Sequence, residues 1–258
     1  MPPRLFGTLA ADAPTVPPAD GRGSGPASSA VGERAAAMVA DGVDVVIVEG
    51  PTTADADDER RWVVDAVEIL AGRCRSAVRT TRPEVARAAA AVGADLFDDP
   101  SGVLVMAAAV AGVGLIVHPP TGPRRPADGN DVVTATAAAL EEMAARAAAA
   151  GVTEIWVDPA LAGHDIERDV TVLANLDMIV AAGRPVVVDT GRTDTVGHLV
   201  ARSDGSDGPA PVEERLVGSV VASTLAVVLG ADGIRVHDVQ AARQATTVFA
   251  GEQHPRRP

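Results

Sequence analysis

The chain has 258 residues, 47% of them hydrophobic, and its 35 acidic and 22 basic side chains give a net charge of −13. This length suits one closed α/β barrel. The acidic balance repels nucleic acid and anionic membranes, so we expect partners of neither kind, and any phosphate site has to be local. Lysine and tyrosine are absent, so no mechanism can depend on them.

Targeting and redox signals are also missing from the sequence. Cys74 is the single cysteine, which excludes an intramolecular disulfide and a cysteine-ligated zinc. The first residues lack the apolar core of a secretion signal, and no run of about 18 apolar residues could span a bilayer. We therefore expect a cytoplasmic protein.

One unit recurs along the chain. An alanine-rich amphipathic segment ends in glycine, and an apolar β-branched run follows after a short loop. Six regular and two less regular copies predict eight strands. These are Leu5 to Leu9, Val43 to Val48, Ala77 to Val78, Ala94 to Phe97, Val113 to Val117, Glu154 to Val157, Pro185 to Val188 and Gly233 to Val236.

The segments between these runs have helical periodicity. Pro83 begins one helix, Asp131 to Ala150 carries an apolar stripe, and Ile166 to Val180 carries another. Weaker helices are predicted at Arg61 to Ala71 and Val239 to Ala250. Because the strands are continuous apolar runs, both of their faces must be buried under helices. The pattern predicts a (β/α)8 TIM barrel, with an open doubly wound sheet as the alternative.

Three stretches have a less regular composition: Ala13 to Ser29, Pro119 to Asn130 and Thr190 to Pro211. They are long for loops after strands, and lids over the strand ends or plain surface insertions would both account for them. We expect residues 1–250 to form a single domain and residues 251–258 to form a flexible tail.

Polar residues follow the apolar runs directly, at the ends where α/β proteins bind ligands. They include Glu49, Arg79, Asp98, His118, Asp158, Asp189 and His237. In the last strand, Arg235 and His237 are two residues apart and share one face. Their donors suit a phosphate or pyrophosphate, although an edge-strand arginine and a core histidine would leave the same pattern.

Seven blocks in order resemble dihydropteroate synthase, a pterin-binding TIM barrel, and the resemblance extends from about residue 4 to 250. They are residues 42–48 (GVDVVIV), 79–86 (RTTRPEVA), 93–102 (GADLFDDPSG), 117–118 (VH), 157–159 (VDP), 211–218 (PVEERLVG) and 235–239 (RVHDV). The resemblance implies that p-aminobenzoate displaces pyrophosphate from a dihydropterin pyrophosphate, in folate synthesis. It implies that Asp158 and Asp98 contact the pterin, and that Arg235, His237 and Thr53 contact the pyrophosphate.

Other positions depart from the family pattern. Ala10 stands where the family has the asparagine that helps to hold Mg²⁺, so metal assistance is not expected from that residue. Arg79 replaces a second pterin-binding carboxylate, and Asp98 replaces an asparagine, so we expect the two side chains to pair with each other. In the loop for the second substrate, Arg192 is the remaining cation because the family lysine beside it is Thr193.

These departures favour a dihydropteroate synthase-like protein that keeps part of the dihydropterin pyrophosphate pocket and has weak or lost transferase activity. The ligand expected at Asp158, Arg235 and His237 is a small molecule that bears a pterin or a phosphate. An active synthase and a non-catalytic scaffold or partner subunit are the alternatives. Homodimers are common in the family, and the sequence neither requires nor excludes one.

Overall fold

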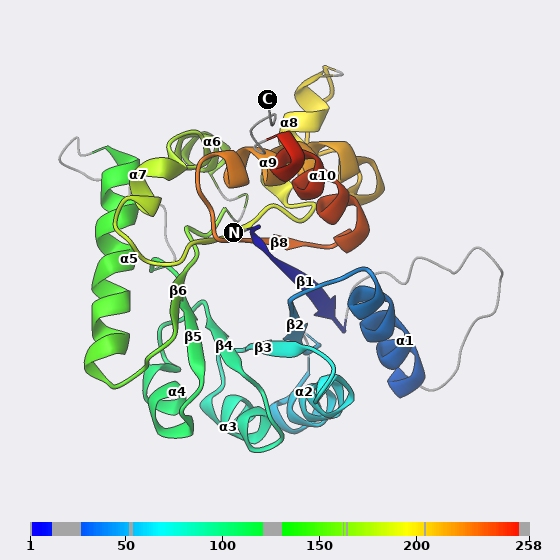
Figure 1. Ribbon diagram of the computed structural model, residues 1–258, viewed down its shortest axis with the longest axis vertical. Coiled ribbons are helices and arrows are strands. Elements are labelled where there is room, and N and C mark those ends of the chain that lie inside the picture. The colour runs from blue at the N-terminus through cyan, green and yellow to red at the C-terminus, as the bar shows by residue number, and fades with distance from the viewer. Residues whose placement is uncertain are drawn as a thin grey trace, which may run out of the picture.

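The computed structural model describes residues 2–11, 27–51, 54–120, 131–161, 163, 165–203 and 205–252. Parallel strands alternate with helices through this part of the chain, and the helices lie outside the ring of strands (Figure 1). The strands are β1 (Arg4–Ala10), β2 (Val45–Glu49), β3 (Arg75–Arg79), β4 (Leu96–Asp99), β5 (Gly114–Val117), β6 (Ile155–Val157), β7 (Val187–Asp189) and β8 (Gly233–Val236). The helices are α1 (Ala27–Ala40), α2 (Ala56–Leu70), α3 (Pro83–Ala91), α4 (Val105–Ala111), α5 (Val132–Ala149), α6 (Ile166–Ala174), α7 (Leu176–Val180), α8 (Asp194–Ser203), α9 (Leu216–Val228) and α10 (Val239–Glu252), with the 3-10 helix η1 (Val212–Arg215).

The sheet closes into a barrel. Its strand order is β6-β5-β4-β3-β2-β1-β8-β7, so each strand pairs with its neighbour in sequence and β1 pairs with β8. The two ends of the sheet meet through an isolated parallel bridge between Val157 of β6 and Val186, the residue before β7. The Val157 amide donates to the Pro185 carbonyl over 2.9 Å. This closure confirms the (β/α)8 barrel and rules out the open sheet.

Apolar side chains fill the inside of the barrel as one layer. Its members are Phe6, Val45, Ile47, Ala77, Leu96, Ile116, Trp156 and Val187. Below this layer, at the amino ends of the strands, Glu154 accepts two hydrogen bonds from Arg75 at 2.7 and 3.0 Å, and Arg4 lies over the Trp156 ring. A larger core cluster separates the strands from the helices. Side chains therefore fill the barrel at the amino ends of its strands, and the polar strand ends predicted from the sequence lie at the opposite, carboxyl end.

Local sequence signals account for several element boundaries. Pro83 occupies the first turn of α3, as predicted, where its missing N–H costs no hydrogen bond. The Asp131 carboxylate caps α5 by accepting from the Val133 amide. Gly112 ends α4 in the left-handed conformation, with φ +69°, which a residue with a Cβ adopts at a cost.

Four predicted boundaries were wrong. The segment from Ile166 to Val180 is two helices, because Asn175, with φ −122° and ψ +33°, interrupts the chain between α6 and α7. The stretch from Thr190 to Pro211 contains α8, in which Val196 and Ala201 are buried. The first helix includes Ala27 to Ser29, and α10 continues through Glu252, two residues beyond the predicted end. Residues 253–258 of the expected tail lie outside the described residues. No described helix is long and apolar enough to cross a membrane.

Candidate functional site at the carboxyl ends of the strands

The polar strand ends predicted from the sequence converge inside the barrel. Side chains two residues apart share one face of a strand, so the residue two positions after each member of the apolar layer also points inward. The described strands place seven charged or titratable side chains there: Glu49, Arg79, Asp98, His118, Asp158, Asp189 and Arg235. We call this set the mouth cluster.

Asp98 is the centre of the mouth cluster. Its carboxylate has no exposed surface and accepts from Arg79 Nη1 at 2.9 Å and from Arg235 Nη2 at 2.5 Å. Its other oxygen lies 2.5 Å from Nε2 of His118. Burial opposes the charge of Asp98, but Arg235, Arg79 and His118 outweigh burial and hold its pKa well below the ordinary value.

Arg79 links Asp98 to Glu49. The hydrogen bond between Arg79 and Asp98 confirms the predicted pairing, and Arg79 Nε also lies 3.5 Å from Glu49 Oε1. The charge of Asp98 raises the pKa of Arg79, against the effect of burial. Burial raises the pKa of Glu49, although Arg235 and Arg79 favour its ionised form.

Arg235 is enclosed by carboxylates. Its side chain is 4% exposed; Nη2 also lies 3.6 Å from Asp158, and Nη1 lies 3.7 Å from Asp189. Burial works against the charge, but Asp98, Asp189 and Asp158 prevail and raise the pKa of Arg235. Within the described parts of the chain, Arg235 Nε is buried without a hydrogen-bond partner. This guanidinium is therefore already neutralised before any anion arrives.

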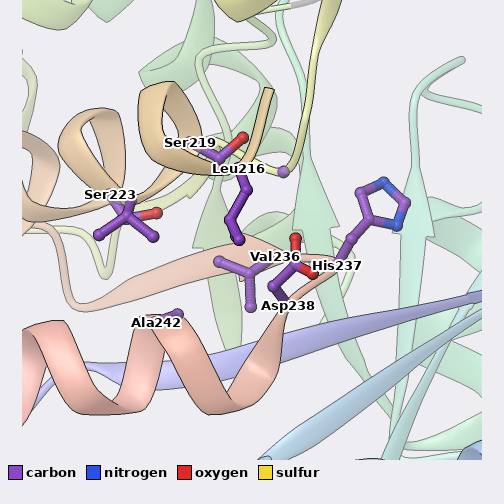
Figure 2. A pocket seen from close by; sticks show the side chains of 9 residues that line it. Leu216, Ser219, Ser223, Val236, His237, Asp238 and Ala242 are labelled. Carbon is purple, nitrogen blue, oxygen red and sulfur yellow. The ribbon is translucent and has the colours of Figure 1, made fainter. Parts of the chain in front are cut away.

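Asp158 and His237 lie beside Arg235. Asp158 is 1% exposed, and its Oδ1 accepts from the Ala160 amide at 2.8 Å. The exposed His237 ring points away from Leu216 and Ala242 (Figure 2). Partial desolvation lowers the pKa of His237, while Asp189 and Asp238 oppose this shift. The roles of Asp158 in pterin binding and of Arg235 and His237 in pyrophosphate binding stay predictions.

A cavity of about 10 Å³ lies behind β8, between that strand and α9. Figure 2 shows side chains that line it. Its lining includes Val236, Ser219 and Ser223. A space of this size holds one water molecule, so it cannot hold a pterin ring.

The loop after β7 is held by ion pairs. Arg192 donates from Nε and Nη2 to the two oxygens of Asp238, each over 2.7 Å, and its backbone takes φ +53°. Arg215 donates to the Arg192 carbonyl at 3.0 Å and to Asp194 at 2.9 Å. The cation expected to attract the second substrate is therefore engaged with Asp238.

The position of the family's metal-binding asparagine does not fit a cation. The Ala10 side chain has no ligand atom, and the Ala10 carbonyl accepts from the Arg34 guanidinium at 3.1 Å. Among the residues that the structure describes, no group of three or more His, Cys, Asp or Glu is placed to hold a metal ion. Thr53, predicted to contact the pyrophosphate, lies outside the described residues.

Comparison with known proteins agrees with this architecture. The profile of the family described as "Pterin binding enzyme" matches residues 23–237. The chain belongs to the pterin-binding enzyme family. This family member is 34% identical over 247 residues to the "Inactive dihydropteroate synthase 2" of Mycobacterium tuberculosis, covering 85% of this chain and 74% of that protein. It is 33% identical to the dihydropteroate synthase of Mycobacterium leprae, covering 84% and 83%.

Solved structures show the same relationship. The Xanthomonas albilineans dihydropteroate synthase in complex with 7,8-dihydropteroate matches with a TM-score of 0.85 and 28% identity, over 98% of this chain and 94% of that one. The Thermus thermophilus enzyme matches with a TM-score of 0.80 and 34% identity, over 96% and 94%. The chain is thus a dihydropteroate synthase-family barrel, the family that serves folate biosynthesis.

Three members of the mouth cluster were not selected as site residues from the sequence: Glu49, His118 and Asp189. Each was recognised only as a polar strand end. Their common signal is that each follows an inward-facing residue, Ile47, Ile116 and Val187, by two positions. Because side chains two residues apart share one face of a strand, all three point to the same interior as the apolar layer.

Proposed function

We propose that this pterin-binding family member binds a pterin at the mouth cluster and has weak or no dihydropteroate synthase activity. The observation that carries the loss of activity is the hydrogen bonding of Asp98, whose carboxylate is occupied by Arg79, Arg235 and His118. A pterin that used Asp98 as an acceptor would have to share this fully buried carboxylate with these donors or displace one of them. Leaving a buried charge partly unpaired costs several kcal/mol, which weakens ligand binding.

The second substrate meets a further obstacle. A p-aminobenzoate carboxylate would have to compete with Asp238 for Arg192, which already forms a bidentate pair. Asp194 lies in the same loop and adds negative charge, partly offset by Arg215. Mg²⁺ assistance at the end of β1 has no side-chain ligand at Ala10, where Arg34 is the neighbouring cation. These three features support loss of turnover.

The direct test is a synthase assay with dihydropterin pyrophosphate, p-aminobenzoate and Mg²⁺, run beside the Mycobacterium leprae synthase. We expect kcat/KM to be at least about 100-fold lower, the effect of losing two contacts of about 1.4 kcal/mol each in the transition state. Isothermal titration calorimetry with pterin ligands, without p-aminobenzoate, measures binding separately. Turnover equal to that of the control enzyme would favour the active-synthase alternative, and absence of any pterin binding would favour a scaffold role.

A restored variant tests the role of the charge pair. Arg79→Asp with Asp98→Asn returns the family's residue types to both positions at once. If the Arg79–Asp98 pair limits pterin binding, this double variant should bind the dihydropterin about 10-fold more tightly, a gain of about 1.4 kcal/mol. Unchanged affinity in a folded double variant would show that the pair does not limit binding.

We also propose a second copy of the chain as partner. Along α9, Val217, Val221 and Val228 are 73%, 63% and 54% exposed and lie on one face of the helix. Light scattering of the parent should report a dimer, and Val221→Asp should yield monomers because it places a charge in the interface. Val110→Asp, on the exposed face of α4, is the matched control and should leave the dimer intact. A monomeric parent would contradict this proposal.

A further inference from the structure

The charges of the mouth cluster are unevenly balanced. Four carboxylates, on Glu49, Asp98, Asp158 and Asp189, face two guanidiniums. Asp98 and Arg235 are covered, with side chains 0% and 4% exposed, whereas Glu49 and Asp189 are 29% and 32% exposed. Arg79 is 31% exposed but lies between Asp98 and Glu49, so its charge is matched on both sides. A ligand entering the barrel therefore meets an excess of negative charge.

Among the residues that the structure describes, the two outer carboxylates keep free acceptor capacity. Glu49 lies 3.5 Å from Arg79 and Asp189 lies 3.7 Å from Arg235, both beyond a good hydrogen-bond distance. Asp189 Oδ1 does accept from the Gly191 amide at 3.0 Å, which leaves Oδ2 for other donors. Burial raises the pKa of both carboxyl groups, and nearby acids add to the rise: Asp98 and Asp189 for Glu49, and Asp158 for Asp189.

One buried donor in the cluster lacks an acceptor. The Arg235 Nε–H has no hydrogen-bond partner among the described residues, and it cannot rely on bulk water because the side chain is only 4% exposed. Buried donors of this kind normally meet an acceptor from the protein, water or a ligand. The cluster thus offers outer acceptors on Glu49 and Asp189 and an inner donor on Arg235.

This pattern of groups selects the chemistry of the ligand. A neutral amino-heterocycle, such as the aminopyrimidinone ring of a pterin, carries N–H donors for the two carboxylates and a ring acceptor for Arg235 Nε. A pyrophosphate carries acceptors alone, and its negative charges would lie against two carboxylates. We infer that Glu49 and Asp189 make the mouth cluster a site for a phosphate-free dihydropterin and select against its pyrophosphate ester. This inference rests on the proposed function, because it assumes that a pterin binds here.

Calorimetric titration of the parent with the dihydropterin alcohol and, separately, with its pyrophosphate ester tests the inference. Both titrations use Mg²⁺-free buffer so that the ester keeps its charge. We expect the alcohol to bind at least about 10-fold more tightly, and Glu49→Gln with Asp189→Asn to reduce this ratio by about 10-fold. Both substitutions keep the side-chain shape while removing the charge, and circular dichroism verifies that the double variant folds.

The matched control is Asp65→Asn with Glu68→Gln, which removes the same charge from exposed positions on α2. It should leave the ratio unchanged. Tighter binding of the ester by the parent, or the same ratio in the mouth and control variants, would overturn the inference while leaving pterin binding intact. Binding of neither ligand would instead overturn the proposed function, and the inference with it.

Discussion

Asp98 is the residue on which the site depends most. It is wholly buried and carries three close donors, so its ionised form is stable only while Arg79, Arg235 and His118 remain in place. Replacing such a group leaves two cations facing a neutral partner inside the barrel. The same residue therefore governs both the stability of the barrel and its readiness to accept a ligand.

Asp98→Asn should lower the free energy of unfolding by about 3 kcal/mol, the usual loss when one member of a buried ion pair is removed. Urea denaturation measures the change. Asp57→Asn, which breaks an exposed pair with Arg60, is the control and should cost less than about 1 kcal/mol. A variant as stable as the parent would mean that the network contributes no net stability.

Glu49, unlike Asp98, destabilises the folded protein when it is ionised, so its contribution to stability depends on pH. Because its pKa is raised in the folded state, the folded protein binds this proton more tightly than the unfolded chain does. Ionisation of Glu49 therefore lowers stability above the ordinary pKa of 4.5. Glu49→Gln should be more stable than the parent at neutral pH, by a difference on the order of 1 kcal/mol. This stability difference should disappear as the pH falls toward 4.5, the ordinary pKa of the group. Urea titrations that show a constant difference across this pH range would contradict the raised pKa of Glu49.

Glycines at helix ends account for much of the regularity of the barrel. Gly112 holds φ +69° after α4, and a Cβ added there would meet nothing within 4 Å. Gly32 lies inside α1, where an added Cβ also meets nothing within 4 Å, but its φ is not in the left-handed region. The same substitution should therefore act in opposite directions at these two positions, for backbone reasons alone.

Gly112→Ala should destabilise the protein by about 1 kcal/mol, since alanine pays for the left-handed conformation. Gly32→Ala should stabilise it by about 0.5–1 kcal/mol, since alanine is the better helix former. Thermal unfolding of both variants with the parent measures the two shifts. Shifts of the same sign would show that contacts, and not backbone conformation, decide the effect at one of these positions.

At the scale of the whole molecule, negative charge is in excess both at the mouth and on the surface. The net charge of −13 creates repulsion that is relieved on unfolding. Exposed ion pairs such as Arg184–Glu141 contribute little to the free energy of unfolding. The buried pairs around Asp98 are shielded from salt by the barrel.

The melting temperature should therefore rise when NaCl increases from about 0.01 to about 0.15 M, over which the Debye length falls from about 30 to about 8 Å. Calorimetric scans at fixed pH measure the shift. A fall in melting temperature would mean that attractive pairs dominate the electrostatic free energy of folding.

Local features of the sequence determined the elements of this protein. Glycine caps and apolar β-branched runs act within a few residues, so eight strands, α3 and α5 and the polar strand ends could be predicted. The break at Asn175 could not, because the apolar spacing continues through it from α6 into α7. The pairing of Arg79 with Asp98 was predicted from two linked departures from the family, and not from residue chemistry alone.

Apart from the pair of Arg79 and Asp98, only the tertiary structure decided which charges of the mouth cluster meet. Arg235 and Asp98 are 137 positions apart, and their contact exists because closure of the barrel brings β8 and β4 to opposite sides of one small interior. The sequence shows an arginine and a histidine on one strand face, which favours an anion site. The folded chain surrounds that arginine with carboxylates, and the resulting balance of charge depends on distances that no local pattern contains.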